Sequence, residues 1–496
     1  MQIAFVTSEV VPFAKTGGLA DVCGALPIEL EKLGHSVALF APAYRSIWQA
    51  GIPIDPTPIR FSIPIGSKAV EGGLLRSTLP QSNVSVYLID QPAYYDRAGL
   101  YGQAGEDYPD NCERFVFFCR AVLESIGQLE FSPDVLHCHD WQTGLIPALF
   151  QTEFCKRSGY PSFATLMTIH NLAYQGSFWH WDMLLTGIDW KYFNWRQMEF
   201  YGQLNLLKTG IVFADAITTV SPRYAEEIQT YEYGCGLEGV LRHRAEAIAG
   251  ILNGIDVDEW NPARDPHLAA GYDRTTWREG KAACKSALQQ ELGLPKSPTT
   301  PLIGSIGRLA SQKGWAIILP VLEKWLLHSD LQWAILGSGD WEYHQALEDL
   351  ARRFPAKLGV RLDFSNGLAH RIEAGADLFL MPSRYEPCGL NQMYSLRYGT
   401  PPIVFHTGGL ADTVVDASPE YLHDKTANGF SFREFTADAL HGTIRRAVET
   451  YNDHPDVWSQ LVERGMQQDW SWSKSAQKYE ALYRQIGAGN RSVQPA

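Results

Sequence analysis

The sequence predicts an α/β fold made of two doubly wound, Rossmann-like domains that face each other across a deep cleft. Short apolar runs alternate with helix-like segments along all 496 residues, which is typical of parallel sheets covered by helices on both faces. The runs form two separate series, and a chain of this length exceeds one ordinary core. One phrase, Thr-Gly-Gly-Leu-Ala-Asp, also occurs once in each half of the chain. These three observations indicate two domains of similar plan.

The first series of expected strands belongs to an N-terminal domain over residues 1–250. Its members are residues 3–6, 37–40, 84–89, 135–136, 166–169 and 217–220. Each is a short apolar run, as expected of parallel strands that are buried on both faces. Helices fit between the strands, and one is expected over residues 19–33, where Gly34 ends it.

The second series of strands belongs to a C-terminal domain over residues 251–469. It begins near residue 248 and includes residues 303–306, 333–336, 378–381 and 403–405. The hinge is expected at residues 252–256, where a turn dipeptide, Asn-Gly, follows a strand. A final helix over residues 470–488 carries Trp and Tyr on one face, so we expect it to return and pack on the N-terminal domain.

Composition and charge exclude several classes of protein. No long uncharged apolar run is present, so a membrane span is not expected. The net charge of −13 argues against a nucleic-acid partner. The eight cysteines are scattered without a Cys-x-x-Cys pair, and the first residues form a strand rather than a signal peptide. Free thiols in a cytoplasmic enzyme explain these features best.

The repeated glycine phrase is the first candidate for chemistry. Its first copy, residues 16–21, follows Lys15 and the first strand, and its second copy occupies residues 407–412. Paired glycines that open a helix let backbone N–H groups approach an oxyanion closely. A tight turn without a ligand would explain either copy alone, but two pseudo-equivalent loops, one per domain, favour a bound anion. We expect unequal roles at one site, because the first loop carries Lys15 from the N-terminal domain and the second lies in the C-terminal domain with the charged residues described next. Neither copy matches a Walker loop or G-x-G-x-x-G.

Two further segments follow strands of the second series. In residues 305–314, Arg308 and Lys313 have the charge and spacing to bracket a diphosphate, although a solvated pair on a loop is the alternative. In residues 381–390, Glu386 lies on a turn constrained by Pro and Gly, where a carboxylate accepts sugar hydroxyls. A surface turn residue is the alternative there.

Two other patterns allow more than one interpretation. His137 and His139 share one side of a strand, but no further ligands have zinc-like spacing, so a packed strand end is favoured and no metal is expected. Residues 178–200 are rich in Trp, Tyr and Phe. A core segment is the favoured interpretation, because stacking on the sugars of an acceptor requires an exposed patch.

Taken in order, these segments resemble the bacterial glycogen synthases and plant starch synthases of glycosyltransferase family 5 over nearly the whole chain. The matching segments are residues 15–22, 94–101, 110–115, 137–141, 168–171, 252–256, 308–314, 370–377, 383–390 and 407–414. The resemblance implies a GT-B fold and transfer of glucose from ADP-glucose to the non-reducing end of an α-1,4-glucan. It also implies retention of configuration, with no metal or cofactor and no nucleic-acid or membrane partner.

The resemblance implies roles for individual residues. Those expected at the reacting groups are Asp140, His170, Arg308, Lys313 and Glu386. Those expected to contact substrate are Lys15, Gly18, Asp21, Tyr95, Trp141, Asn171, Asn253, Phe364, Cys388, Gly389, Thr407 and Gly408. Among them, Phe364 stands where the family often has an aromatic residue stacked on adenine.

Two positions depart from the wider pattern of retaining enzymes. Tyr394 stands where many carry a second Glu, which agrees with the glycogen and starch synthase branch and weakens a sucrose or trehalose transferase. Asn391 stands where Thr is common. Because no second carboxylate is evident near His170, a front-face attack is favoured over a glycosyl-enzyme intermediate.

Other functions stay open from the sequence alone. A glucan phosphorylase shares the two-domain plan but requires a Lys-bound pyridoxal phosphate and a longer chain. A catalytically inactive glucan-binding or regulatory homologue is the second alternative, against which the intact charged residues speak. No residue distinguishes ADP from UDP by itself.

Overall fold

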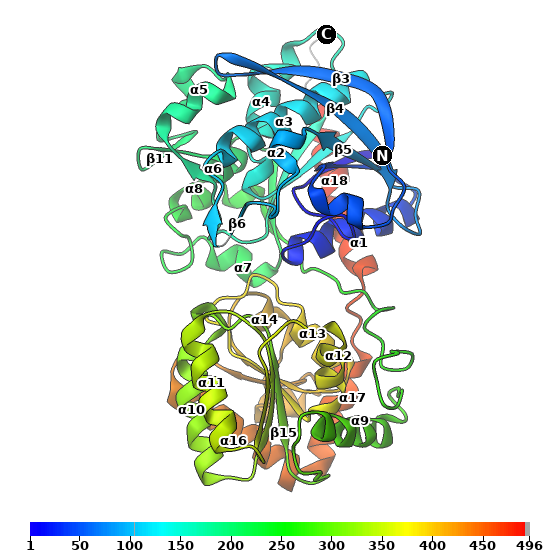
Figure 1. Ribbon diagram of the computed structural model, residues 1–496, viewed down its shortest axis with the longest axis vertical. Helices are drawn as coiled ribbons and strands as arrows, with labels where there is room; N and C mark the ends of the chain where they lie inside the picture. The colour runs from blue at the N-terminus through cyan, green and yellow to red at the C-terminus, as the bar shows by residue number, and fades with distance from the viewer. Residues whose placement is uncertain (104, 492–496) are drawn as a thin grey trace. The chain divides into compact units, whose positions relative to one another are not determined.

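The computed structural model describes residues 1–103 and 105–491. The chain divides into two compact units, each with its own sheet and core (Figure 1). Unit 1 comprises Met1–Gly254 and the chain from Trp472 onward, and unit 2 comprises Ile255–Ser471. Each unit has a sheet of mainly parallel strands covered by helices, so the predicted α/β class is confirmed.

The sheet of unit 1 has nine strands in the order β14-β13-β9-β8-β1-β2-β5-β4-β3. Its parallel part consists of β1 (Gln2–Val6), β2 (Ser36–Pro42), β5 (Ser85–Asp90), β8 (Val135–His139), β9 (Ala164–Ile169), β13 (Ala216–Thr219) and β14 (Ile248–Gly250). At one edge, β3 (Asp55–Ile65) and β4 (Lys68–Thr78) form an antiparallel hairpin. The sequence did not predict this hairpin, because its exposed and buried residues alternate instead of forming an apolar run.

The start of the second strand series was predicted wrongly. The strand near residue 248 is β14, which pairs in parallel with β13 in the sheet of unit 1. The apolar run identified a strand but carried no information about its partner. The structural division comes later, after Gly254.

Helices and short strands complete unit 1. The helices are α1 (Gly18–Lys32), α2 (Pro92–Tyr95), α3 (Asn111–Gln128), α4 (Ile146–Thr152), α5 (Met183–Thr186), α6 (Leu206–Phe213), α7 (Pro222–Glu227), α8 (Glu238–His243) and α18 (Trp472–Arg491). The short strands are β6 (Gly102–Gln103), β7 (Glu106–Asp107), β10 (Ser177–Phe178), β11 (Glu199–Phe200) and β12 (Gln203–Asn205). The last three form a small antiparallel sheet.

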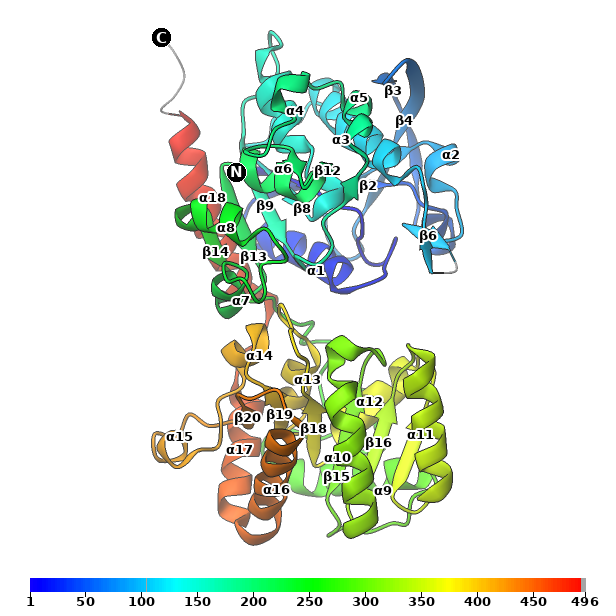
Figure 2. The same ribbon diagram turned by 90° about the vertical axis from the view of Figure 1, so that its left-hand side faces the viewer.

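The last helix, α18, is part of the core of unit 1. It lies beside α1 and is drawn in red in Figures 1 and 2. Trp472, Tyr479 and Tyr483 recur at helical spacing and are buried with residues of β1 and α1. Burying each of these rings contributes roughly 1.5–3 kcal/mol or more, so α18 is an integral element of the unit.

Unit 2 is built on six parallel strands in the order β17-β16-β15-β18-β19-β20. The strands are β15 (Leu302–Ile306), β16 (Gln332–Leu336), β17 (Leu358–Arg361), β18 (Leu378–Met381), β19 (Pro402–Phe405) and β20 (Phe430–Phe432). Its helices are α9 (Trp277–Glu291), α10 (Trp315–His328), α11 (Trp341–Arg353), α12 (Asn366–Gly375), α13 (Asn391–Arg397), α14 (Gly408–Thr413), α15 (Pro419–His423), α16 (Ala437–Asp453) and α17 (Pro455–Gln467). In Figure 1, α10, α11 and α16 cover one face and α9 and α12 the other.

The connectivity gathers the predicted residues at one edge of each sheet. In unit 1, the segments that follow β1, β8 and β9 contain Lys15, Asp140 and His170, and these strands are neighbours. In unit 2, Arg308 and Glu386 follow the neighbouring strands β15 and β18. Ligands of open α/β sheets bind at these carboxyl ends.

Candidate active site

Asp140 and His170 form the centre of the candidate site in unit 1. They follow the adjacent strands β8 and β9, and the backbone N–H of His170 donates to Asp140 Oδ1 over 2.8 Å. Asp140 has a φ of +56°, a conformation that non-glycine residues adopt rarely. Its own N–H donates to Thr168 O over 3.0 Å. The turn therefore directs the carboxylate of Asp140 toward His170, at the carboxyl ends of β8 and β9.

Burial moves the protonation of this pair in opposite directions. It raises the pKa of the Asp140 carboxyl to about 7, although the N–H groups of His170 and Asn171 limit the rise, and the charge of Glu9 adds to it. Burial lowers the pKa of the His170 imidazole to about 3. Near neutral pH, His170 is therefore neutral and Asp140 titrates.

His170 is hydrogen-bonded to a buried group of histidines in the core of unit 1. His170 Nε2 and His139 Nδ1 share a hydrogen bond of 2.9 Å, and His137 bonds to Tyr483 of α18 and to Thr168. Burial holds the pKa of both His137 and His139 well below the usual value. Among the described residues, no group of three or more His, Cys, Asp or Glu side chains is arranged to hold a metal ion.

The first glycine loop is organised by Glu9, a residue that the sequence analysis missed. Its buried carboxylate accepts from the N–H groups of Thr16 and Gly17 over 2.6 and 3.1 Å. It also accepts from the hydroxyls of Thr16 and Tyr101 over 2.6 and 2.7 Å. Glu9 therefore already engages the N–H of Gly17, one of the two glycines expected to approach an oxyanion, whereas the predicted contact residue Gly18 is not among the donors to Glu9. The available signal was the glutamate between the first strand and the loop. A carboxylate that is buried at this place needs hydrogen-bond donors, and the loop supplies them.

The face of this loop nevertheless has room for a ligand. A Cβ added to Gly17 or Gly18 would meet no heavy atom of the described chain within 4 Å. Lys15 forms an ion pair of 2.6 Å with Asp21, and both side chains are partly exposed. The loop thus presents a positioned ammonium group beside open space.

Three further predicted contacts lie in the same unit. Trp141 follows Asp140 and packs edge-on against Phe115, with ring centroids 4.9 Å apart. Asn171 Oδ1 accepts from the N–H of Ala173 over 3.1 Å. Asn253 is buried, and its Oδ1 has no hydrogen-bond partner among the described residues. An unsatisfied buried oxygen of this kind is rare and consistent with a ligand that supplies the donor.

Tyr95 is placed differently from the prediction. It is completely buried, its hydroxyl donates to Arg114 O over 3.0 Å, and its ring packs against Tyr44 and Tyr94. The side chain has no surface to offer a substrate in this structure. It supports the segment between β5 and α3 instead.

In unit 2, the residues predicted for diphosphate and for sugar lie together. Lys313 Nζ and Glu386 Oε2 form an ion pair of 2.6 Å, and the Glu386 side chain is nearly buried. Gln312 joins the two loops, because it accepts from Arg308 Nη2 over 3.3 Å and donates to Tyr385 O over 3.1 Å. A cation and a carboxylate are therefore held side by side at the ends of β15 and β18.

The second glycine loop packs against the Glu386 turn. Gly408 has a φ of +44°, and a Cβ there would lie 2.0 Å from Glu386 O. A Cβ on Gly409 would lie 2.0 Å from Cys388 O, and the Gly409 N–H donates to Glu386 O over 3.0 Å. These glycines allow two backbones to touch, and the second loop lies against the turn that carries Glu386.

The remaining predicted residues of unit 2 differ in accessibility. Thr407 is fully buried at the N-terminus of α14, so its side chain has no exposed surface for a substrate. Gly389 has a φ of +74°, which favours glycine, and Cys388 is buried beside it. Phe364, after β17, is 91% exposed and presents an open ring face.

Comparisons with known proteins decide the family. Residues 2–243 match the family described as starch synthase catalytic domain, and residues 289–461 match glycosyl transferases group 1. A glycogen synthase of Rhodopirellula baltica is 48% identical over 99% of both chains, and one of Anaeromyxobacter dehalogenans is 49% identical over 98% of this chain and its whole length. The chain belongs to the glycogen and starch synthase family.

A solved member of that family has the same fold. The catalytic domain of starch synthase IV from Arabidopsis thaliana, bound to ADP and acarbose, superposes with a TM-score of 0.89 at 33% identity. The match covers 98% of this chain and 99% of the other. The predicted family and the predicted GT-B fold are therefore both confirmed.

The two departures of this synthase have structural explanations. Tyr394 stacks on Trp260, with centroids 3.8 Å apart, and the opposite partner of Trp260 is His370, also at 3.8 Å. Asn391 Nδ2 donates to Ile306 O over 3.0 Å, which ties the start of α13 to the end of β15. Both residues thus stabilise unit 2.

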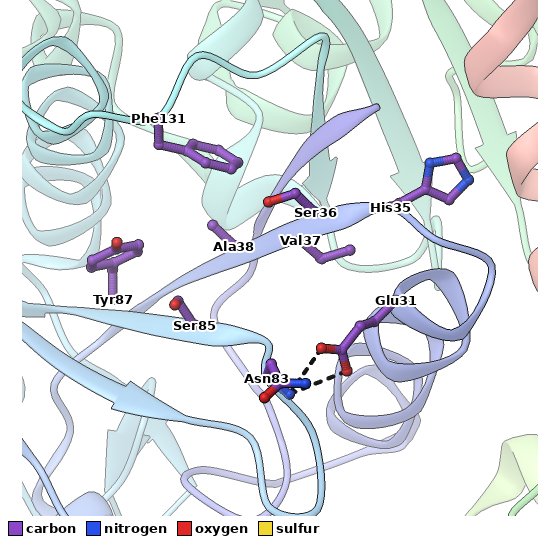
Figure 3. A pocket seen from close by; sticks show the side chains of 9 residues that line it. All are labelled: Glu31, His35, Ser36, Val37, Ala38, Asn83, Ser85, Tyr87 and Phe131. Atoms are coloured by element: carbon purple, nitrogen blue, oxygen red, sulfur yellow. Dashed lines mark hydrogen bonds between the residues drawn. The ribbon is translucent and has the colours of Figure 1, made fainter.

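Pockets elsewhere in the synthase do not contain the predicted residues. Figure 3 shows one of about 200 Å³ at the starts of β2 and β5, where Glu31 accepts from the N–H of Asn83. A larger one in unit 2, about 700 Å³, is lined by His406 and Ala411 among others. Within the described residues, no helix has the length and apolarity needed to span a bilayer.

Proposed function

We propose that this synthase transfers glucose from ADP-glucose to the non-reducing end of an α-1,4-glucan with retention of configuration. The observation that carries the proposal is the Lys313–Glu386 pair, which holds an ammonium group and a carboxylate 2.6 Å apart, the two charges that a sugar diphosphate needs. Relatives at 44–49% identity over nearly the full chain are glycogen synthases. We also propose that it acts in the cytoplasm, where cysteines that form no disulfide among the described residues stay reduced.

On the donor side, we infer that Arg308 and Lys313 neutralise the diphosphate as it departs. Arg308 is exposed and only weakly bonded to Gln312, so its guanidinium is available to a ligand. When the donor binds, Lys313 shares its ammonium between Glu386 and a phosphate oxygen. Glu386 then accepts glucose hydroxyls, and preorganised charges of this kind act most strongly as charge develops. Phe364 offers its ring to adenine.

On the acceptor side, we infer that Asp140 in its ionised form stabilises positive charge at the reacting sugar carbon. The bond from that carbon to phosphate breaks, the bond to the acceptor hydroxyl forms on the same face, and the departing phosphate oxygen takes the hydroxyl proton. Glu9 is not a nucleophile, because its carboxylate is held by four hydrogen bonds. This supports front-face transfer without a glycosyl-enzyme.

The phosphate assignment is tested by Lys313→Ala. With ADP-glucose and glycogen, we expect kcat/KM to fall about 10²- to 10³-fold, because one preorganised electrostatic contact is lost. Lys324→Ala, which removes an exposed lysine from α10, is the matched control and should retain full activity. Unchanged turnover in Lys313→Ala would refute the assignment.

Donor and protein class are tested in the same assay. Competition between ADP-glucose and UDP-glucose, compared as kcat/KM, establishes the base. A glucan-binding protein without activity would bind glycogen but incorporate no labelled glucose.

A further inference from the structure

Tryptophan rings are exposed on the surface of unit 1. Trp179, Trp181 and Trp190 are 62%, 48% and 41% exposed, and we call these three residues the tryptophan strip. They belong to the segment around α5 and β11 (Figure 1). The sequence analysis favoured a core role for this segment, and for these three residues that expectation is wrong.

The rings of the strip contact one another in series. The centroids of Trp179 and Trp181 are 6.4 Å apart, and those of Trp181 and Trp190 are 5.5 Å apart. Trp190 in turn contacts Phe193 at 5.1 Å. Isolated exposed apolar residues are ordinary, but a contiguous group of this size marks an interaction surface.

The strip begins next to a residue that packs beside the candidate active site. Phe178, the residue before Trp179, contacts the ring of Trp141 with centroids 5.6 Å apart. Trp141 directly follows Asp140. The first residue of the strip is therefore one position along the chain from a ring that packs against the segment of Asp140, within unit 1.

The backbone beneath the strip is anchored by hydrogen bonds. In the small sheet, Asn205 Nδ2 donates to Ser177 Oγ over 3.0 Å and to Gln175 Oε1 over 2.8 Å. Asp189 caps the turn that carries Trp190, because its side chain accepts from the Lys191 N–H over 2.9 Å. Because the backbone is already held in place, the indole rings lose little conformational entropy when a ligand binds.

The chemistry of the strip fits a glucan better than a protein surface. Pyranose rings have apolar C–H faces that stack on indole, and their edges carry hydroxyls. Polar groups lie among the indoles, including His180, Asp182 and Lys191, and these can bond to the hydroxyls. The acceptor is a polymer, so the units behind its reacting end have to lie across the surface next to the site.

We propose that the tryptophan strip binds the α-glucan acceptor outside the active site and retains the polymer between transfers. This inference rests on the proposed function for the identity of the ligand. It assigns the strip to affinity for long chains and not to the chemical step. Long and short acceptors should therefore respond differently to its removal.

The test is the double variant Trp181→Ala/Trp190→Ala. In native gels that contain glycogen, we expect the apparent Kd to rise about ten-fold, because two stacking contacts are lost. KM for glycogen should rise by a similar factor. kcat/KM for maltotriose, which is too short to extend along the strip, should stay at the level of the parent protein.

Two single variants serve as matched controls. Trp48 in unit 1 and Trp341 in unit 2 are 58% and 70% exposed and lie outside the strip. Neither Trp48→Ala nor Trp341→Ala should change retardation by glycogen.

Three outcomes would overturn the inference. They are unchanged glycogen affinity in the double variant, an equal loss of activity on maltotriose, and dissolution of a dimer at unchanged affinity, which would identify a second copy of the chain as the occupant. Failure of the proposed function is separate. It would appear as absent glucose incorporation by the parent protein, while the strip still determined retardation by glycogen.

Discussion

Asp140 and His170 respond to the same burial with opposite changes in protonation. The pKa of the carboxyl is raised to about 7 and that of the imidazole is lowered to about 3. Of this pair, only Asp140 titrates near neutral pH. The hydrogen bond from the His170 N–H favours the ionised form, and only the ionised form can counter positive charge on a sugar.

This difference predicts the pH dependence of transfer. We expect kcat/KM to rise with pH around a midpoint near 7, as Asp140 ionises. Asp140→Asn should lose this rise and react about 10²-fold more slowly, because an electrostatic contact to the transition state is removed. Asp90→Asn is the control, since burial also raises the pKa of Asp90 but its position is outside the site. A rise of unchanged midpoint in Asp140→Asn would contradict the assignment.

The same shift has a consequence for stability, with a definite sign. A carboxyl whose pKa is higher in the folded than in the unfolded state stabilises the folded state. This stabilisation is fully present at pH values below the pKa of the unfolded state. For Asp140 that contribution is lost as pH rises through about 7. The protein therefore holds Asp140 ionised at some expense of stability, as is common at functional sites.

Single residues also show where the sequence analysis was limited. Arg308, Lys313 and Glu386 were found because charged residues after strands are conspicuous. Glu9 was missed because its role depends on a hydrogen-bonding partner seven residues away, and Tyr95 was misplaced because burial of a tyrosine cannot be read from its neighbours. The roles of Glu9 and Tyr95 both depend on contacts that form only in the folded chain.

At the scale of elements, one phrase has two structural roles. The glycines that open α1 face open space, whereas those that open α14 touch the backbone of the Glu386 turn. Identical letters alone do not distinguish these roles. The difference arises because the first loop is held by Glu9, seven residues earlier, whereas the second packs against the Glu386 turn, which follows another strand, β18.

Alanine substitutions should separate the two roles. Gly18→Ala should leave Tm unchanged, because its Cβ enters open space, but should weaken use of ADP-glucose if the loop approaches the diphosphate. Gly409→Ala should lower Tm by about 4 °C or more, because its Cβ meets Cys388 O at 2.0 Å. Gly442→Ala, on α16 with open space, is the control for unit 2. Equal melting of all three variants would contradict this distinction.

Elements buried on both faces were predicted well, and elements at edges were not. The apolar runs of β1, β9, β15 and β18 identify these strands directly. The β3–β4 hairpin has one exposed face and therefore no such run. For the same reason, an edge strand such as β14 reveals neither its sheet nor its unit.

At the scale of the whole molecule, each unit has a separate hydrophobic core, and the chain leaves and re-enters unit 1. Ser471 belongs to unit 2 and the next residue, Trp472, to unit 1. The sequence indicates such a return by an amphipathic helix without a partner in its own neighbourhood. The stability of unit 1 consequently depends on residues at the far end of the chain.

The last prediction tests that dependence at Tyr483. This residue is fully buried, and its hydroxyl bonds to His137 Nδ1 over 2.8 Å. Tyr483→Ala should reduce the free energy of unfolding of unit 1 by about 3–5 kcal/mol, whereas Tyr483→Phe should cost about 1 kcal/mol for the lost hydrogen bond. Hydrogen exchange should report lower protection in β1, β8 and β9 only.

The matched change in unit 2 is Trp458→Ala. Trp458 is buried in the core of that unit and packs edge-on against Tyr451 at 4.9 Å. Its removal should lower protection in β15 and β18 and leave the strands of unit 1 protected. If Tyr483→Ala destabilised both units equally, the cores would be coupled, and the picture of two separately stabilised units joined by a crossing chain would have to be abandoned.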